Sequence, residues 1–191
     1  MTTEQRQIWE REKRAVRRLR DSAGKPVDPG ITETVAILRL LGLTTTSSCA
    51  GHLDRRVGPW VGFKSPRVAA DRERMNHAAD RSPEKRRALR LALKHNAAEL
   101  QTLVGLLDRF YDERAVPSSR RLIVQGFGVV GYNLSSQSAD LLRLVPRDQR
   151  RALLVSQRDE LRAFTDFLKA EFFGTKNDAP SSATPPAPGR E

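Results

Sequence analysis

Hydroxyl and thiol side chains are concentrated in one short run of the chain, and a histidine ends it. Residues 44–52 read TTTSSCAGH, so hydroxyl residues lead through Cys49 and two small residues to His52. Serine and threonine hydroxyls both donate and accept hydrogen bonds, and successive backbone N–H groups in a tight turn form a concave anion site. We therefore expect this run to bind a polar ligand such as a phosphate or a carboxylate.

Cys49 and His52 admit two other interpretations. A thiolate beside an imidazolium is an activated nucleophile, and two such side chains three residues apart can meet across a turn. Alternatively, Cys49 is an inert thiol packed where a strand meets a turn. We expect no metal site, because His77 and His95 do not have the i, i+4 spacing of helical ligands and no carboxylate cluster accompanies them.

Other candidate binding residues flank this run. Asp28 precedes Pro29, a pair typical of a helix start, so its carboxylate either caps that helix or orients a substrate amine. Trp60 lies close to Arg55 and Arg56, an arrangement suited to stacking on a nucleic-acid base beside cationic groups. The alternative for Trp60 is ordinary core packing.

A glycine pattern near residue 126 has two interpretations. Residues 126–131 read GFGVVG, which has the G-x-G-x-x-G spacing of dinucleotide-binding loops. Such a loop must open directly into a helix and be followed by an acidic residue about 20 positions later. Residues 132–136 instead continue as strand and turn, so the pattern favours a bent strand or two strands in a hairpin.

The remaining periodicities predict an α+β fold, in which a small β-sheet packs with several long helices. The strands are expected near 43–49, 59–63 and 121–134. The helices are expected at 3–20, from 29 to 41, from 67 onward with a long helix over 82–114, and over 139–173 with a break at Pro146. Residues 1–174 should form a single domain with a charged N-terminal helix, and the proline-rich residues 175–191 a disordered tail.

Composition narrows the class of protein. The 191 residues suffice for one ordinary domain, and the single cysteine excludes an internal disulfide framework and a cysteine-rich zinc module. No apolar block reaches the ~18 residues of a membrane span, and the charged N-terminus has no signal-peptide core. We therefore expect a cytoplasmic protein.

Positive charge is in excess. Lys and Arg number 34 against 23 Asp and Glu, a formal net charge of +11, and cations crowd residues 11–20 and 81–94. Such a field attracts RNA or another polyanion. A solvated helix surface would carry the same charges.

Residues 21–63 resemble the core motif of the wybutosine-synthesis tRNA methyltransferase family. That motif contains Asp-x-Ser, a later Asp, a helix, a Thr-Thr-Ser-Ser-Cys-x-Gly-Arg run and a strand bearing tryptophan. The matching positions are Asp21, Ser22, Asp28, Thr45, Thr46, Ser47, Ser48, Cys49, Gly51 and Trp60. This chain departs from the motif in three places. Asp21 and Ser22 are adjacent instead of one residue apart, His52 stands where the family has arginine, and Lys64-Ser65 replaces a strand ending in histidine. The resemblance implies an α+β fold, S-adenosylmethionine as methyl donor and a modified tRNA base as acceptor.

Under this hypothesis the site residues take three roles. Asp28 and His52 are catalytic, with His52 as acid or base. Thr45, Thr46, Ser47, Ser48, Cys49 and Gly51 bind the cofactor, and Trp60, Arg55 and Arg56 bind the substrate.

The run SCAGHLD at 48–54, followed by PWV, is also similar to bacterial proteins without an assigned function. The second hypothesis is therefore a non-enzymatic bacterial or mobile-element protein that binds nucleic acid or a small ligand.

Overall fold

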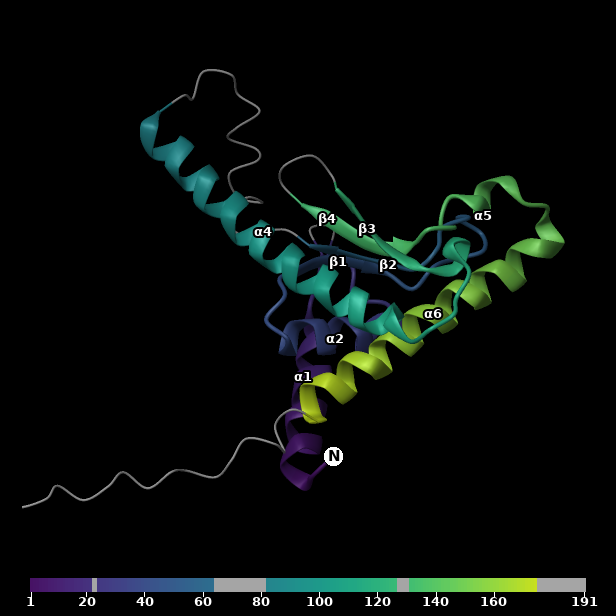
Figure 1. Cartoon of the computed structure of the whole chain (residues 1–191), viewed down its shortest axis with the longest axis horizontal. Coiled ribbons are helices and arrows are strands. Elements are labelled where there is room, and N and C mark those ends of the chain that lie inside the picture. The colour runs from purple at the N-terminus through teal and green to yellow at the C-terminus, as the bar shows by residue number, and fades with distance from the viewer. Residues whose placement is uncertain (22–23, 64–81, 127–130, 175–191) are drawn as a thin grey trace, which may run out of the picture.

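A computed structural model describes residues 1–21, 24–63, 82–126 and 131–174 (Figure 1). It contains the helices and strands in the order α1 (Thr3–Arg18), α2 (Thr32–Leu40), β1 (Thr45–Cys49), β2 (Trp60–Phe63), α4 (Pro83–Asp112), β3 (Leu122–Gly126), β4 (Tyr132–Ser136), α5 (Leu141–Leu144) and α6 (Arg147–Gly174). Short 3-10 turns precede α2 at Pro29–Ile31 and β3 at Ser118–Arg120. The predicted α+β class is confirmed.

The four strands form one antiparallel sheet in the order β1-β2-β4-β3. Strands were predicted near 43–49 and 59–63, and β1 and β2 occupy these places. The apolar stretch 121–134 forms two strands, β3 and β4, that pair with each other. A strand rather than a helix therefore follows the G-x-G-x-x-G spacing, which excludes the dinucleotide loop.

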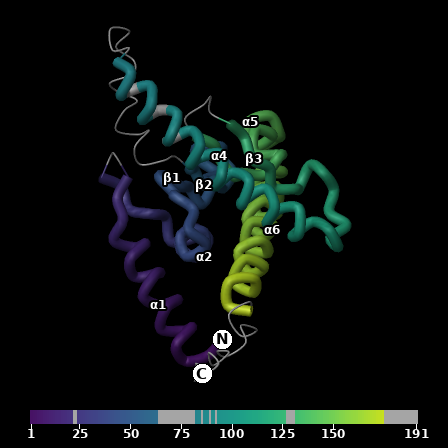
Figure 2. Tube along the Cα trace, turned by 60° about the vertical axis from the view of Figure 1, so that its left-hand side comes forward, coloured from purple at the N-terminus to yellow at the C-terminus, as the bar shows by residue number. Residues whose placement is uncertain are grey.

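Helix α2 is the centre of the helical layer and lies between α1 and α6 (Figure 2). Five of its consecutive residues, Thr34 to Leu38, are buried. Aromatic contacts join α6 to α4, where Phe164 lies 5.1 Å from Phe110 between ring centroids, and the sheet contributes the stacked pair Phe63 and Tyr132 at 4.8 Å. The apolar faces of α1, α2, α4 and α6 and of the sheet thus share one core.

Helix α1 is charged on its exposed faces and is anchored at its N-terminal end. Thr2 and Gln5 form a capping box, with the Gln5 N–H donating to Thr2 Oγ1 at 3.2 Å and the Thr2 N–H donating to Gln5 Oε1 at 2.8 Å. Gln5 Nε2 also donates to the Phe173 carbonyl at 2.8 Å, and Trp9 packs edge-to-face on the Phe173 ring. The first helix is therefore tied to the last one.

Helix boundaries differ from the predictions in several places. Val145 is extended because it precedes Pro146, so the predicted stretch 139–173 divides into α5 and α6. Helix α2 begins after the Pro29–Ile31 turn, and Asp28 makes no side-chain capping bond there, contrary to the capping interpretation. The helical residues expected from 67 and the tail expected at 175–191 lie outside the described residues. Among the described helices, none has the length and apolar character needed to cross a bilayer.

Candidate functional site

The site is built on a sharp turn at the end of β1. Gly51 has φ +82°, a conformation that side chains with a Cβ disfavour. A Cβ at this position would lie 2.7 Å from Leu154 Cδ1 and 3.0 Å from the Pro59 backbone nitrogen. His52 then exchanges two backbone hydrogen bonds with Val57, at 2.8 and 3.1 Å. Glycine is thus required both for the direction of the turn and for the close packing behind it.

A guanidinium from α6 holds this turn in place. Arg158 Nε donates to the Ala50 carbonyl at 2.9 Å, and Nη2 donates to the Gly51 carbonyl at 2.7 Å. Hydrogen bonds from a charged donor are stronger than neutral ones. The position of the turn relative to α6 is therefore set by two such bonds.

The carboxylate of Asp28 reaches the same turn from the start of the α2 segment. Its Oδ2 accepts a hydrogen bond from the Ala50 N–H at 3.0 Å and lies 3.2 Å from His52 Nε2. Burial raises the pKa of Asp28, but the Ala50 N–H and the His52 ring lower it by more, so the pKa lies below its usual value. Asp28 is therefore ionised at neutral pH, and its Oδ2 accepts the bond from the His52 ring.

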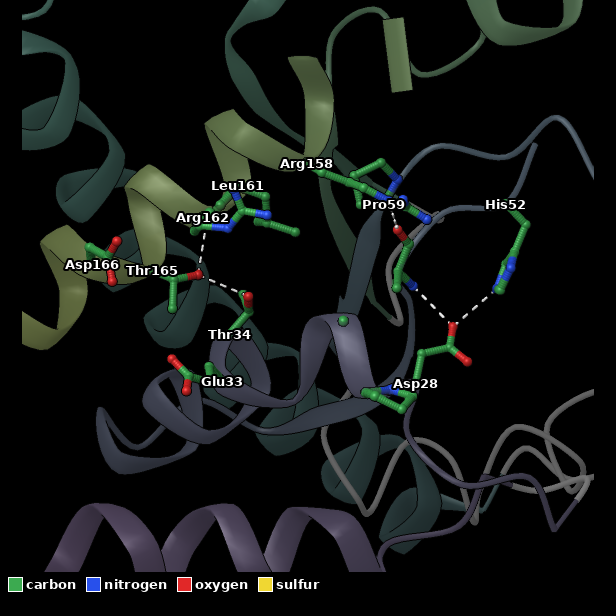
Figure 3. A pocket seen from close by; sticks show the side chains of 13 residues that line it. Asp28, Glu33, Thr34, His52, Pro59, Arg158, Leu161, Arg162, Thr165 and Asp166 are labelled. Carbon is green, nitrogen blue, oxygen red and sulfur yellow. Dashed lines mark hydrogen bonds and ion pairs between the residues drawn. The ribbon is translucent and has the colours of Figure 1, made fainter. Parts of the chain in front are cut away.

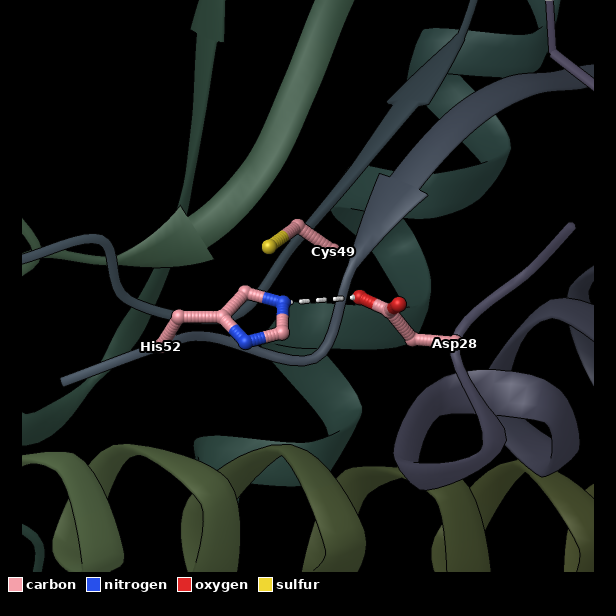
Figure 4. A group of neighbouring side chains, drawn as sticks. All are labelled: Asp28, Cys49 and His52. Carbon is pink, nitrogen blue, oxygen red and sulfur yellow. Dashed lines mark hydrogen bonds and ion pairs between the residues drawn. The ribbon is translucent and has the colours of Figure 1, made fainter. Parts of the chain in front are cut away.

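Cys49 completes a cluster of three functional groups (Figure 4). One carboxylate oxygen of Asp28, Cys49 Sγ and one ring nitrogen of His52 all lie within 4.8 Å of one another. Burial, with the charge of Asp28, raises the pKa of the Cys49 thiol despite the Gly51 N–H, which donates to Sγ at 3.4 Å. In this state Cys49 is a neutral thiol, which does not favour the activated-nucleophile interpretation.

A cavity of about 650 Å³ opens beside Asp28 and His52 (Figure 3). Its volume lies within the range of about 300–1,000 Å³ typical of small-molecule sites. Groups of both charge signs line it together with small and apolar residues. The charged residues are Asp28, Glu33, Asp166, Arg158 and Arg162, and the others are His52, Thr34, Thr165, Pro29, Gly30, Ala50, Pro59 and Leu161.

The hydroxyl run itself faces a different hollow. Thr45, Thr46, Ser47 and Ser48 line a cavity of about 120 Å³. Across it stand the cations Arg20, Lys25 and Arg39, the carboxylate Asp21, and Leu19, Pro26, Val27 and Val35. The structure therefore divides the predicted site into two hollows, one at the hydroxyl run and one at the turn that follows it.

The predicted substrate residues lie outside both cavities. Trp60 is half-buried in β2, where it pairs with Cys49 on one side and Ser135 on the other. Arg55 and Arg56 are exposed on the loop that follows His52, and Arg55 Nε lies 4.0 Å from Asp54. None of the three lines the cavity beside His52 or the one beside the hydroxyl run.

Several site residues gave no signal in the sequence. Arg158, Arg162, Thr165 and Asp166 come from α6, and Glu33 and Thr34 from α2. On helices rich in charge, these side chains look like any solvated helix surface. Arg158 is more than 100 residues from Ala50 in the sequence, yet the two are hydrogen-bonded. Only the tertiary structure brings these side chains to the cavity.

Of the two histidines that the sequence analysis considered and rejected as metal ligands, His95 is described by the structure, and it is not part of this cluster. His95 forms an i, i+4 pair with Glu99 at 2.9 Å on α4, and His77 lies outside the described residues.

Comparisons of the chain with protein-family models, with curated proteins and with solved structures find no match. A functional proposal therefore depends on the chemistry of the cavity and on the sequence motif.

Proposed function

We propose that this chain is a tRNA- or nucleotide-modifying enzyme that binds S-adenosylmethionine in the cavity beside Asp28 and His52 and transfers its methyl group. The single observation that carries the proposal is the combination in that cavity of a His–carboxylate pair with facing carboxylates and guanidinium groups. The resemblance of residues 21–63 to the wybutosine-synthesis methyltransferases supports the same chemistry.

The charges of the cavity suit a zwitterionic cofactor. S-adenosylmethionine carries a carboxylate, an ammonium and a sulfonium. Arg162, which forms an exposed ion pair with Asp159 at 2.7 Å, offers a guanidinium for the carboxylate. Glu33 and Asp166, which both pair with Lys169 at 3.4 and 3.5 Å, offer carboxylates for the two cationic centres. The smaller cavity, at about 120 Å³, is too small for such a ligand.

Methyl transfer requires that the cofactor and the acceptor be held in line, with no nucleophile from the protein. The acceptor atom forms a bond to the methyl carbon, the carbon–sulfur bond breaks, and its electron pair stays on sulfur. A nitrogen or oxygen acceptor also loses a proton, and we assign its acceptance to His52 Nδ1, because Nε2 donates to the ionised carboxylate of Asp28. Asp28, 3.2 Å from Nε2, then stabilises the imidazolium.

The basic surface supports an RNA acceptor. Arg86, Arg87, Arg90 and Lys94 are exposed along the first half of α4, which extends away from the sheet (Figure 1). The smaller hollow, with three cations opposite a row of hydroxyls, suits a single phosphate group. Phosphate contacts of this kind hold RNA without reading its sequence.

Calorimetry with S-adenosylmethionine tests the proposal. Wild-type protein should bind S-adenosylmethionine saturably. Arg162→Ala should bind it about 10-fold more weakly, because the variant loses one hydrogen bond from a charged donor. Arg109→Ala is the matched control, because Arg109 also makes an exposed ion pair at 2.6 Å but lies away from this cavity. Ser48→Ala should leave cofactor affinity unchanged and weaken RNA binding.

Two outcomes would contradict the proposal. Absence of binding heat with both S-adenosylmethionine and its demethylated product would favour the second hypothesis, a non-enzymatic domain that binds nucleic acid or another small ligand. Equal losses of affinity in Arg162→Ala and Arg109→Ala would show that the cofactor does not occupy this cavity.

A further inference from the structure

The cluster of Asp28, Cys49 and His52 holds three different types of metal ligand at one point of the fold (Figure 4). A carboxylate oxygen, a thiol sulfur and an imidazole nitrogen approach each other from two separate segments, the start of the α2 segment and the end of β1. We propose that these three side chains bind one Zn²⁺ ion, whose fourth coordination position faces the cavity of about 650 Å³.

The distances suit a tetrahedral ion. With metal bonds of about 2.0–2.2 Å to oxygen and nitrogen, two such ligands of a tetrahedral Zn²⁺ lie about 3.3–3.5 Å apart. His52 Nε2 and Asp28 Oδ2 are 3.2 Å apart. A thiolate ligand belongs about 3.6 Å from each of them, and Cys49 Sγ lies within 4.8 Å. A small side-chain rotation therefore brings all three atoms to binding distance.

The donor set and its spacing favour zinc. Sulfur, nitrogen and oxygen together form the borderline set that Zn²⁺ accepts, whereas Mg²⁺ and Ca²⁺ prefer oxygen alone. Cys49 and His52 are separated by two residues, the short chelating spacing found in many zinc sites. Gly51 supplies the sharp turn between them, and its N–H donates to Cys49 Sγ at 3.4 Å, a bond that stabilises a metal-bound thiolate.

The groups around the cluster already hold the ligands. The Ala50 N–H donates to the Asp28 carboxylate, and Arg158 donates to the consecutive carbonyls of Ala50 and Gly51 in the turn. The side chains of Asp28 and His52 are 34% and 33% exposed, so an ion can enter from solution. Such supporting contacts set ligand orientation and metal affinity.

Three protein ligands with an open fourth position are typical of catalytic rather than structural zinc. Asp28 and His52 both line the cavity, so a water molecule or a substrate atom in the cavity completes the tetrahedron. This inference does not rest on the proposed methyl transfer. When the ion is bound, His52 Nε2 is a ligand, and the metal-bound group becomes the one that gives up a proton.

The test uses the full chain, stripped with a chelator and dialysed, and adds Zn²⁺ or Co²⁺ alone. We expect one Zn²⁺ per chain by elemental analysis. Co²⁺ should give the visible bands of a tetrahedral ion together with a thiolate-to-cobalt charge-transfer band. Cys49→Ala should remove the charge-transfer band, and both Cys49→Ala and His52→Ala should weaken Zn²⁺ binding at least about 100-fold, more than the loss of an outer-shell contact.

Matched variants separate a site from adventitious binding. His95→Ala removes another histidine paired with a carboxylate, and it should leave stoichiometry and spectrum unchanged. Far-UV circular dichroism checks that each variant folds. If Cys49→Ala does not fold, Asp28→Asn serves as a second variant that removes a metal ligand. Zn²⁺ should raise the melting temperature of the wild type but not of the ligand variants.

The proposal is overturned if stripped wild-type protein takes up no added Zn²⁺ and gives no cobalt spectrum, or if folded Cys49→Ala keeps both the affinity and the charge-transfer band. Because no methyl donor is present, neither result bears on the proposed enzyme activity. Calorimetry with S-adenosylmethionine on stripped and on zinc-loaded protein then measures the cofactor site separately.

Discussion

Two histidine–carboxylate pairs in the described part of the chain have the same chemical groups but differ in the segments they come from and in their surroundings. His95 and Glu99 are 2.9 Å apart on one helix, whereas His52 and Asp28 are 3.2 Å apart and come from segments 24 residues distant. The Glu99 side chain is only 7% exposed, and it accepts two hydrogen bonds from Thr44, one from the N–H at 3.2 Å and one from Oγ1 at 2.6 Å. Its carboxylate thus joins α4 to Thr44, the residue that precedes β1.

The pair at Asp28 has a different environment. It borders the cavity of about 650 Å³, and a thiol stands beside it. The comparison separates a pair whose carboxylate is hydrogen-bonded to Thr44 from a pair that faces a cavity. Access to a cavity and a neighbouring thiol distinguish the pair at the turn, and four experiments test that distinction.

The largest effect is expected at the turn. Gly51→Val places a β-branched residue at φ +82° and against Leu154 and Pro59, so strain and overpacking together should cost about 4 kcal/mol of unfolding free energy. The control is Gly105→Ala in α4, which has open space at its Cβ and should gain up to about 1 kcal/mol from helix propensity. Urea denaturation measures both, and a Gly51→Val protein as stable as wild type would contradict the role given to this turn.

Removal of the two histidines should affect function unequally. His52→Ala should slow methyl transfer from labelled S-adenosylmethionine to tRNA by about 100-fold, the lower end of the contribution of a general acid or base. His95→Ala should change the rate by less than about 2-fold, since His95 lines neither the cavity beside His52 nor the one beside the hydroxyl run. Similar rates for the two variants would remove the functional distinction between the pairs.

Removal of either carboxylate should lower stability, but here the larger loss is expected for the pair on α4. Glu99→Ala leaves both Thr44 donors without their acceptor and should cost about 2 kcal/mol. Asp28→Ala loses one backbone hydrogen bond at a site one-third exposed and should cost about 1 kcal/mol or less. Thermal unfolding in metal-free buffer compares them, and a larger loss for Asp28→Ala would indicate that Asp28 is chiefly structural.

The smallest effect concerns the basic surface near His95. RNA affinity should fall steeply as salt concentration rises, and Arg90→Ala should reduce the magnitude of the slope of log K against log salt by about one. Arg162→Ala, at the cavity, should leave that slope nearly unchanged. Binding that does not respond to salt would argue against RNA as the partner of α4.

Sequence patterns alone were enough for most of the fold. Capping residues, apolar periodicity and β-branched runs predicted α1, α2, β1 and β2 to within a few residues, because helices and strands depend on local hydrogen bonding and on the spacing of apolar side chains. The break before Pro146 followed from the steric effect of proline on Val145. The glycine-punctuated stretch 121–134 left open whether one strand or two would form.

At the site, the sequence identified Asp28, Cys49, Gly51 and His52 by residue type and spacing. It placed the hydroxyl run in the same pocket, which the structure does not do, and it assigned Asp28 a possible capping role that the Ala50 N–H replaces. Arg158 and Arg162 were indistinguishable from other surface arginines. The meeting of a turn, a helix start and a distant helix depends on how apolar faces pack, and packing between segments far apart in the chain leaves no local pattern.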